Sequence, residues 1–266
     1  MSRSENPDFV EAIGRGLDVL RAFGPDSPSM SLAEVAAATG LPRPTIRRIL
    51  VTLEMLGYVR SEDRRFVLTP KVLDLGYAYV SSMGLWQIAR PHLKDLVATT
   101  HESSSMAQLD GSEIVYVGRV AVPKIVTIAV AVGTRLPAAV TAMGRVLLAG
   151  LSSDEIDEVL DAPQLGSIVP RAPIDRSALH KAVADVRSQG WALVDQELAV
   201  GIRSIAAPLL DDSGRVIAAV NVCVQAAEHS VEKLRTEFLP LLLDKAAAIS
   251  TDFVRANRLS KVVATT

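Results

Sequence analysis

The stretch from Ser31 to Arg65 constrains the fold of this chain more than any other part of it. Ser31 and Glu34 have the spacing of a capping box, which predicts that a short helix begins at this serine. Gly40 to Pro42 interrupt that helix, and a second helix is expected to start around Pro44, with a proline in its first turn. A hairpin then follows, and this order of elements predicts a winged helix-turn-helix.

The second helix has two different faces. Its apolar side is expected to form the core, with Ile46, Ile49, Leu50, Leu53 and Leu56. Its opposite side carries Pro44, Arg47, Arg48, Val51 and Met55. Gly57 ends the helix, and residues 58–60 and 65–68 are predicted to form the two hairpin strands.

Clustered arginines on this motif predict contact with double-stranded DNA. The net charge of the chain is only −2, so binding must come from a local patch. Arginine presents a planar fork that suits guanine edges and phosphates. We expect Arg47 and Arg48 to meet bases or adjacent phosphates, and Arg64 and Arg65 to meet the DNA backbone. The candidate DNA-binding residues are Arg43, Pro44, Thr45, Arg47, Arg48, Arg64 and Arg65. The alternative is a solvated arginine face on an ordinary helical bundle.

The rest of the chain predicts a second domain of a different kind. We place the winged helix-turn-helix domain at residues 1–83, a linker helix at 84–101, and the second domain at 102–266. Strands around Asp110-Gly111 flank a hairpin turn, and residues 124–132 are β-branched and predict another strand. Further strands are expected at 191–195, 203–210 and 215–225, and helices at 141–150, 153–161, 175–189 and 231–257. This pattern indicates an α+β fold with an antiparallel sheet covered by helices.

The strand at residues 215–225 has one aliphatic face and one mixed face. Asn221, Cys223 and Gln225 lie on the mixed face, which suits the floor of a small-molecule pocket. An amide and a thiol against solvent or at a sheet edge explain this strand equally well.

No catalytic or metal-binding pattern stands out. The four histidines are scattered, Cys223 has no histidine near it in sequence, and no glycine-rich phosphate loop is present. Asp195 and Glu197 are the one pair that suggests acid–base chemistry. We therefore expect no enzyme activity, no cofactor and no metal. The longest aliphatic run, about 125–132, is too short to span a bilayer, so we expect a cytoplasmic protein without a membrane partner.

The chain resembles the IclR family of bacterial transcription regulators over essentially its full length. The segments that carry the resemblance are AIGRGLDVLRAF, SLAEVAAATGLPRPTIRRILVTLEMLGYV, LTPKVLDLG, AVTAMGRVLLA and DQELAVGIRSIAAPLLDDSGRVIAAVNV. LGYAYVSS and HESSSMAQLDGSEIVYVGRV are similar to the subgroup that controls genes for protocatechuate and p-hydroxybenzoate catabolism through the β-ketoadipate pathway.

The resemblance implies a dimer or dimer of dimers and a GAF-like C-terminal domain that binds a small effector at residues 102–266. Matching positions for the effector site are Ala142, Met143, Gly144, Asp195, Glu197, Ser204, Asn221 and Cys223. Pro44 departs from the family, which often has a small hydroxyl residue or alanine there, and this puts the helix cap in doubt.

These observations favour a transcription factor that responds to an aromatic acid or a β-ketoadipate-pathway intermediate. Ser204, Asn221 and the N–H groups at the start of the helix at 141 are candidate donors to an effector carboxylate. Arg135, Arg145 or Arg203 is a candidate positive charge. Two alternatives stay open: an enzyme that acts on an aromatic acid and uses the winged helix for docking, and a regulator in which Cys223 senses oxidants.

Overall fold

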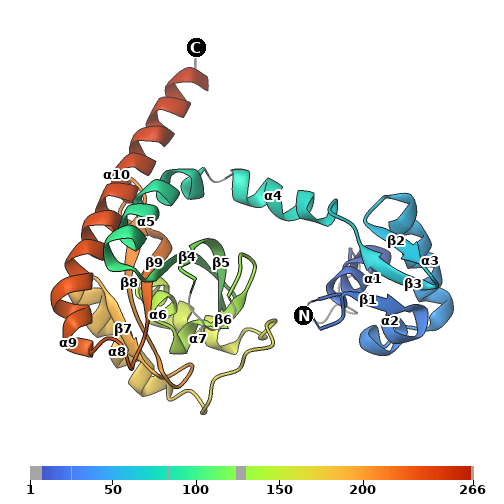
Figure 1. The fold of residues 1–266 in the computed structure, drawn as a ribbon, viewed down its shortest axis with the longest axis horizontal. Coiled ribbons are helices and arrows are strands. Elements are labelled where there is room, and N and C mark those ends of the chain that lie inside the picture. The colour runs from blue at the N-terminus through green and yellow to red at the C-terminus, as the bar shows by residue number, and fades with distance from the viewer. Residues whose placement is uncertain (1–7, 25, 83, 124–129, 265–266) are drawn as a thin grey trace. The chain divides into compact units, whose positions relative to one another are not determined.

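The computed structural model describes residues 8–24, 26–82, 84–123 and 130–264. The chain divides into two compact units, Met1–Ser82 and Met83–Thr266 (Figure 1). The first unit has one hydrophobic core cluster, and the second has two, one on each face of a sheet.

The first unit is a winged helix-turn-helix. It contains α1 (Glu11–Arg21), β1 (Ser29–Ser31), α2 (Leu32–Thr39), α3 (Arg43–Met55), β2 (Val59–Glu62), β3 (Arg65–Leu68) and α4 (Val72–Ser82). The predicted capping box is confirmed, because the Ser31 hydroxyl accepts from the Glu34 N–H (3.3 Å) and the Glu34 carboxylate accepts from the Ser31 N–H (2.6 Å). The core consists of Val19, Phe23, Met30, Val35, Ile46, Leu50, Leu53 and Val59.

The wing has three strands where the sequence predicted two. Strand β3 lies between β2 and the short β1, and all pairs are antiparallel. Asp63 and Arg64 form the two-residue turn between β2 and β3, with φ angles of 48° and 65°. Positive φ at both positions is what a tight hairpin turn matching the strand twist requires.

Several large apolar side chains of the first unit are exposed. Ile13 and Leu17 share an apolar face of α1, yet they are 63% and 50% exposed. The prediction that Leu56 is buried is wrong: α3 ends at Met55, and Leu56 is 52% exposed. All three residues line an apolar groove between α1, α3 and α4. Periodicity identifies an apolar face but does not say what covers it.

The second unit is built on one antiparallel sheet with strand order β6-β5-β4-β9-β8-β7. Its strands are β4 (Ser103–Asp110), β5 (Glu113–Val120), β6 (Arg135–Pro137), β7 (Ala192–Asp195), β8 (Ile202–Leu210) and β9 (Val216–Gln225). Its helices are α5 (Leu85–Thr100), the 3-10 turn η2 (Ala138–Val140), α6 (Ala142–Leu148), α7 (Ser153–Asp161), α8 (Arg176–Gln189), α9 (Val231–Lys233), the π turn η3 (Leu234–Phe238) and α10 (Leu239–Ala264). The strand predicted at 124–132 falls mostly outside the described residues, and 130–132 form no strand.

Helices cover both faces of this sheet (Figure 1). One face packs against α5, η3 and α10, and the other against α6, α7 and α8. The helix expected as a linker, α5, therefore lies in the core of the second unit, with Leu85, Ala89, Leu93 and Leu96 buried. From Ala218 onward β9 alternates as predicted. A bulge beside Leu210 makes Val216 and Ile217 pack against the opposite clusters from those the simple alternation gives.

Candidate functional site

Helix α3 begins without a side-chain cap. Arg43 is its first residue, and Pro42 before it has no side-chain oxygen that could accept a capping hydrogen bond from the first turn. Pro44 lies in the first turn, where a backbone N–H has no acceptor within the helix, so the proline removes no helical hydrogen bond. The proline thus leaves the helix intact, although the cap itself is missing.

The arginines of the first unit fall into two groups. Arg43, Arg47, Arg48 and Arg64 are exposed, and their guanidinium groups make no hydrogen bond or ion pair with the residues that the structure describes. Arg65 is engaged. It donates to the Ser29 carbonyl (2.6 Å) and forms an ion pair with Glu34 (2.9 Å). Of the two wing arginines predicted to contact DNA, Arg65 is therefore bound within the protein, whereas Arg64 has no partner among the described residues.

A cavity lies over the sheet face covered by α6 in the second unit. Five of the predicted effector residues line it: Ala142, Met143, Ser204, Asn221 and Cys223. Ser103, Cys223 and Ser204 pair across three adjacent strands, and Ser105 pairs with Asn221 one row away. Residues paired across an antiparallel sheet project from the same face, so these side chains form a small polar floor. Apolar walls include Leu136, Val140, Leu198 and Ile202.

The hydrogen bonds of the floor determine which groups of Ser204 and Asn221 are used within the protein. The Asn221 side-chain oxygen accepts from the N–H of Ser105 (2.9 Å), so its Nδ2 must be the group that donates to the Ser204 Oγ (3.0 Å). The Ser204 hydroxyl hydrogen makes no bond to the described residues. Ser204 can therefore donate to a ligand, whereas Asn221 is largely used within the protein.

The other three predicted effector residues do not line the cavity. Asp195 forms an ion pair with Arg203 (2.6 Å), and the hydrogen bond from this arginine lowers the pKa of Asp195. Glu197 forms an ion pair with Arg145 (2.9 Å). Gly144 lies against the backbone of Ala138, and a Cβ at Gly144 would overlap the carbonyl of Ala138.

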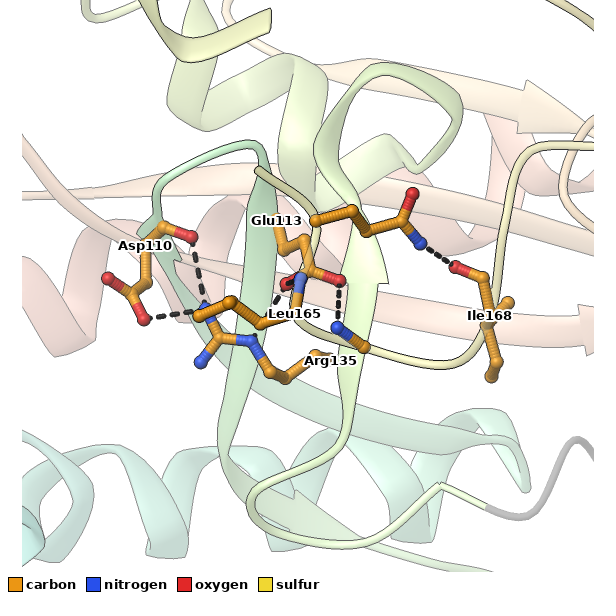
Figure 2. A network of polar contacts seen from close by, with 7 residues as sticks. Asp110, Glu113, Arg135, Leu165 and Ile168 are labelled. Carbon is orange, nitrogen blue, oxygen red and sulfur yellow. Dashed lines mark hydrogen bonds and ion pairs between the residues drawn. The ribbon is translucent and has the colours of Figure 1, made fainter. Parts of the chain in front are cut away.

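Arg135 is part of a network of polar contacts around the buried carboxylate of Glu113 (Figure 2). The Glu113 carboxylate accepts from Arg135 Nε (2.8 Å) and from the N–H groups of Leu165 (3.0 Å) and Gly166 (2.9 Å). Arg135 also forms an ion pair with Asp110 (2.6 Å). Burial raises the pKa of Glu113, but these hydrogen bonds outweigh burial and the pKa is lowered overall. The network thereby fixes β6, which leads directly into the wall at 136–143.

The predicted effector residues did not include several polar side chains that line the cavity, among them Glu102, Ser103, Tyr116 and Arg119. Glu102 is hydrogen-bonded to His229 (2.7 Å). Tyr116 and Arg119 both lie on β5, and a bulge at Val117 separates them. The bulge shifts the pairing register of the hairpin, so the face on which Arg119 lies cannot be read from alternation alone. Burial, and to a lesser degree the nearby Cys223, raises the pKa of Tyr116 above its usual range, so its phenol stays protonated.

Two family models match this chain. Residues 12–63 match the IclR helix-turn-helix domain, and residues 77–251 match the C-terminal domain of the bacterial transcriptional regulator IclR. The chain belongs to the IclR family. It is therefore a DNA-binding transcriptional regulator with an effector-binding domain and is not an enzyme, which removes the docking-enzyme alternative.

Similar IclR-family proteins extend over nearly the whole chain. The Pca regulon regulatory protein of Pseudomonas putida is 41% identical over 90% of this chain and 82% of its own length. The p-hydroxybenzoate hydroxylase transcriptional activator of Acinetobacter baylyi is 33% identical over 90% of each chain. An IclR homologue from Microbacterium hydrocarbonoxydans, solved with 4-hydroxybenzoate, has a TM-score of 0.79 at 24% identity and covers 92% of this chain and 100% of its own. At that identity the likeness shows the fold.

One cluster of this IclR-family chain has the ligand types of a metal site. The ligand atoms of Glu102, Glu228 and His229 lie within 4.8 Å of one another. Glu102 and His229 already hydrogen-bond each other at 2.7 Å, and this pair accounts for their proximity without an ion. None of the helices among the described residues is long and apolar enough to cross a membrane.

Proposed function

We propose that α3 enters the DNA major groove with Arg47 and Arg48 against base edges or adjacent phosphates. Arg43, Pro44 and Thr45 lie in the first turn of α3 and would meet the groove edge. Arg64, at the tip of the wing, would approach a backbone phosphate. The observation that supports this arrangement is the exposed, unpaired state of all four arginines in the part of the chain described. The role proposed here places the protein in the cytoplasm, where operator DNA is found.

Operator binding tests the DNA contacts. Replacing Arg47 and Arg48 together with alanine should weaken binding to a specific operator by at least 10-fold, because each arginine–base or arginine–phosphate contact contributes about 1–3 kcal/mol. Arg176→Ala in the second unit, whose guanidinium binds Asp161, serves as the matched control. Unchanged binding of the double variant in a gel shift would contradict the groove assignment.

We further propose that the effector is an aromatic acid or a ring-cleavage product of the β-ketoadipate pathway. The cavity over the sheet carries this proposal: its walls are mainly apolar, and its floor offers the donor hydroxyl of Ser204. Two relatives, the Pca regulon regulatory protein and the p-hydroxybenzoate hydroxylase transcriptional activator, support the same chemistry by their names.

Calorimetry with protocatechuate, p-hydroxybenzoate and β-ketoadipate tests the effector class. At least one should bind with one site per chain, and Ser204→Ala should weaken that binding by about 5- to 10-fold, because a hydrogen bond to a neutral hydroxyl contributes about 1 kcal/mol. Ser213→Ala, in the turn after β8, is the control. No heat with any of the three acids would remove the effector class and leave family membership standing.

We also propose a homodimer, or a dimer of such dimers. The two winged helix-turn-helix domains of a dimer, here called its DNA-binding heads, would each bind one half of a palindrome-like operator. The groove between α1, α3 and α4 supports this proposal, because it exposes Ile13, Leu17, Leu56 and Leu75 on one small unit. An apolar surface of this kind is unusual on a protein that stays monomeric.

A further inference from the structure

Arg119 lies on the cavity side of the sheet. Ser105 pairs with Arg119 on one side and with Asn221 on the other, so the three residues form one row across β5, β4 and β9. Asn221 and Arg119 both line the cavity. Because paired residues of an antiparallel sheet project from the same face, the Arg119 side chain leaves the sheet on the side of the floor residues.

The other candidate arginines are committed elsewhere. Arg135 binds Glu113 and Asp110, Arg145 binds Glu197, and Arg203 binds Asp195. Arg119 is half-buried and makes no hydrogen bond or ion pair with any described residue. A half-buried guanidinium group is partly removed from water, and here no protein acceptor among the described residues replaces the lost hydration. A ligand carboxylate would replace it with charge-assisted hydrogen bonds.

The positive charge of Arg119 acts within the cavity. It opposes the rise that burial and Cys223 cause in the pKa of Tyr116, whose side chain also lines the cavity. This effect agrees with the position of both residues in the lining of one cavity.

We propose that Arg119 binds the carboxylate of the effector and sets the specificity of the cavity for acids. This inference rests on the proposed effector class and adds the residue that reads its charge. A planar guanidinium matches a carboxylate with two parallel hydrogen bonds. Ser204 lies three strands away, at roughly 14 Å between backbones. The effector therefore carries its carboxylate and a second, hydrogen-bonding group at opposite ends, as a para-substituted benzoate does.

A ligand-by-variant cycle tests the assignment by calorimetry. The ligands are p-hydroxybenzoate and its neutral amide, p-hydroxybenzamide, and the proteins are the wild type, Arg119→Met and Arg119→Lys. The wild type should prefer the acid over the amide by about 10- to 100-fold, as expected for a charge-assisted pair. Arg119→Met should abolish this preference while binding the amide as before, and Arg119→Lys should retain part of it. Arg171→Met, at the rim of a separate groove, is the control and should keep the full preference.

The outcomes separate this inference from the effector class. If p-hydroxybenzoate binds Arg119→Met as tightly as it binds the wild type, Arg119 does not bind the carboxylate, and the proposed effector class still stands. Equal losses for acid and amide would show that Arg119 only shapes the cavity, which also overturns the inference. If protocatechuate, p-hydroxybenzoate and β-ketoadipate all fail to bind the wild type, both proposals fall. A preference for o-hydroxybenzoate over the para isomer would overturn the end-to-end placement.

Discussion

Arg65 joins three parts of the DNA-binding head. Its guanidinium donates to Ser29 of β1 and to Glu34 of α2, while its backbone belongs to β3 in the wing. Glu34 in turn caps α2 through Ser31. We therefore expect Arg65 to position the wing against the helix-turn-helix, and Arg64 to make the phosphate contact.

The salt dependence of operator binding separates these two roles. Arg64→Ala should weaken binding and reduce the slope of log K against log salt by about one, because one phosphate contact is lost. Arg65→Ala should weaken binding with an unchanged slope, and Glu34→Ala should reproduce its effect. Anisotropy titrations over a range of salt concentrations measure both quantities. A reduced slope for Arg65→Ala would instead make it a phosphate contact.

Glu113 should govern the acid stability of the second unit. Its pKa in the folded protein lies below the ordinary value of 4.5, so the fold favours the carboxylate form. The stabilisation is fully present above pH 4.5 and is lost as the pH falls through the lowered folded pKa. Glu113→Gln should therefore lower the free energy of unfolding at pH 7 by about 2–4 kcal/mol and flatten its decline below pH 4.5.

Urea unfolding at several pH values measures this effect. Glu158→Gln is the matched control, because Glu158 is exposed on α7. Equal acid sensitivity of the wild type and Glu113→Gln would show that other carboxylates dominate.

At the scale of elements, strand β5 contacts the cavity and helix α5 through consecutive residues. Arg119 faces the cavity, and Gly118 before it lies under the Trp86 ring of α5, where a Cβ would overlap the indole. Any movement of β5 on effector binding should therefore shift Trp86. A β-bulge such as the one at Val117 bends the strand and changes the direction in which the neighbouring side chains point.

Tryptophan fluorescence tests this coupling. In a Trp191→Phe background, emission from Trp86 should change on saturation with the effector. Gly118→Ala should displace the indole, destabilise the unit by about 1–3 kcal/mol, and reduce the emission change. The reciprocal variant, Trp86→Phe with Trp191 kept, should show little response. Constant Trp86 emission at saturation would exclude α5 as the responding element.

Local signals explain which elements the sequence predicted well. Ser31, Ser152 and Asp175 each cap a helix at the predicted start, because a cap depends on residues three positions apart. The three-residue strands β1 and β6 were missed, since their only support is pairing with a strand far away in sequence. The role of Arg119 could not be predicted for a similar reason. The sheet face on which it lies depends on a bulge in β5, and its lack of an ion pair depends on which acidic residues the other arginines contact in the folded chain.

At the scale of the whole molecule, the exposed groove of the head should control self-association. Leu17→Asp should weaken the dimer by at least 10-fold, because it places a charge in an apolar contact. Operator affinity should fall with it, since two heads bind a two-part site more tightly than one. Sedimentation velocity over a concentration series measures the dissociation constant.

Val169→Asp provides the control for that measurement. Val169 is 64% exposed in the second unit and lies outside the groove. If Leu17→Asp dimerises as the wild type does, the contact between copies lies on another surface.

The hydrogen bond from Asn221 to Ser204 has a consequence for the chemistry of synthetic inducers. The amide occupies one lone pair of the Ser204 oxygen, so the hydroxyl keeps its own hydrogen and a second lone pair for a ligand. In the placement proposed above, a phenol or an aromatic methoxy group at that end should accept this hydrogen. A compound of nearly the same size with a methyl group there offers no lone pair, and we expect it to be the weaker inducer.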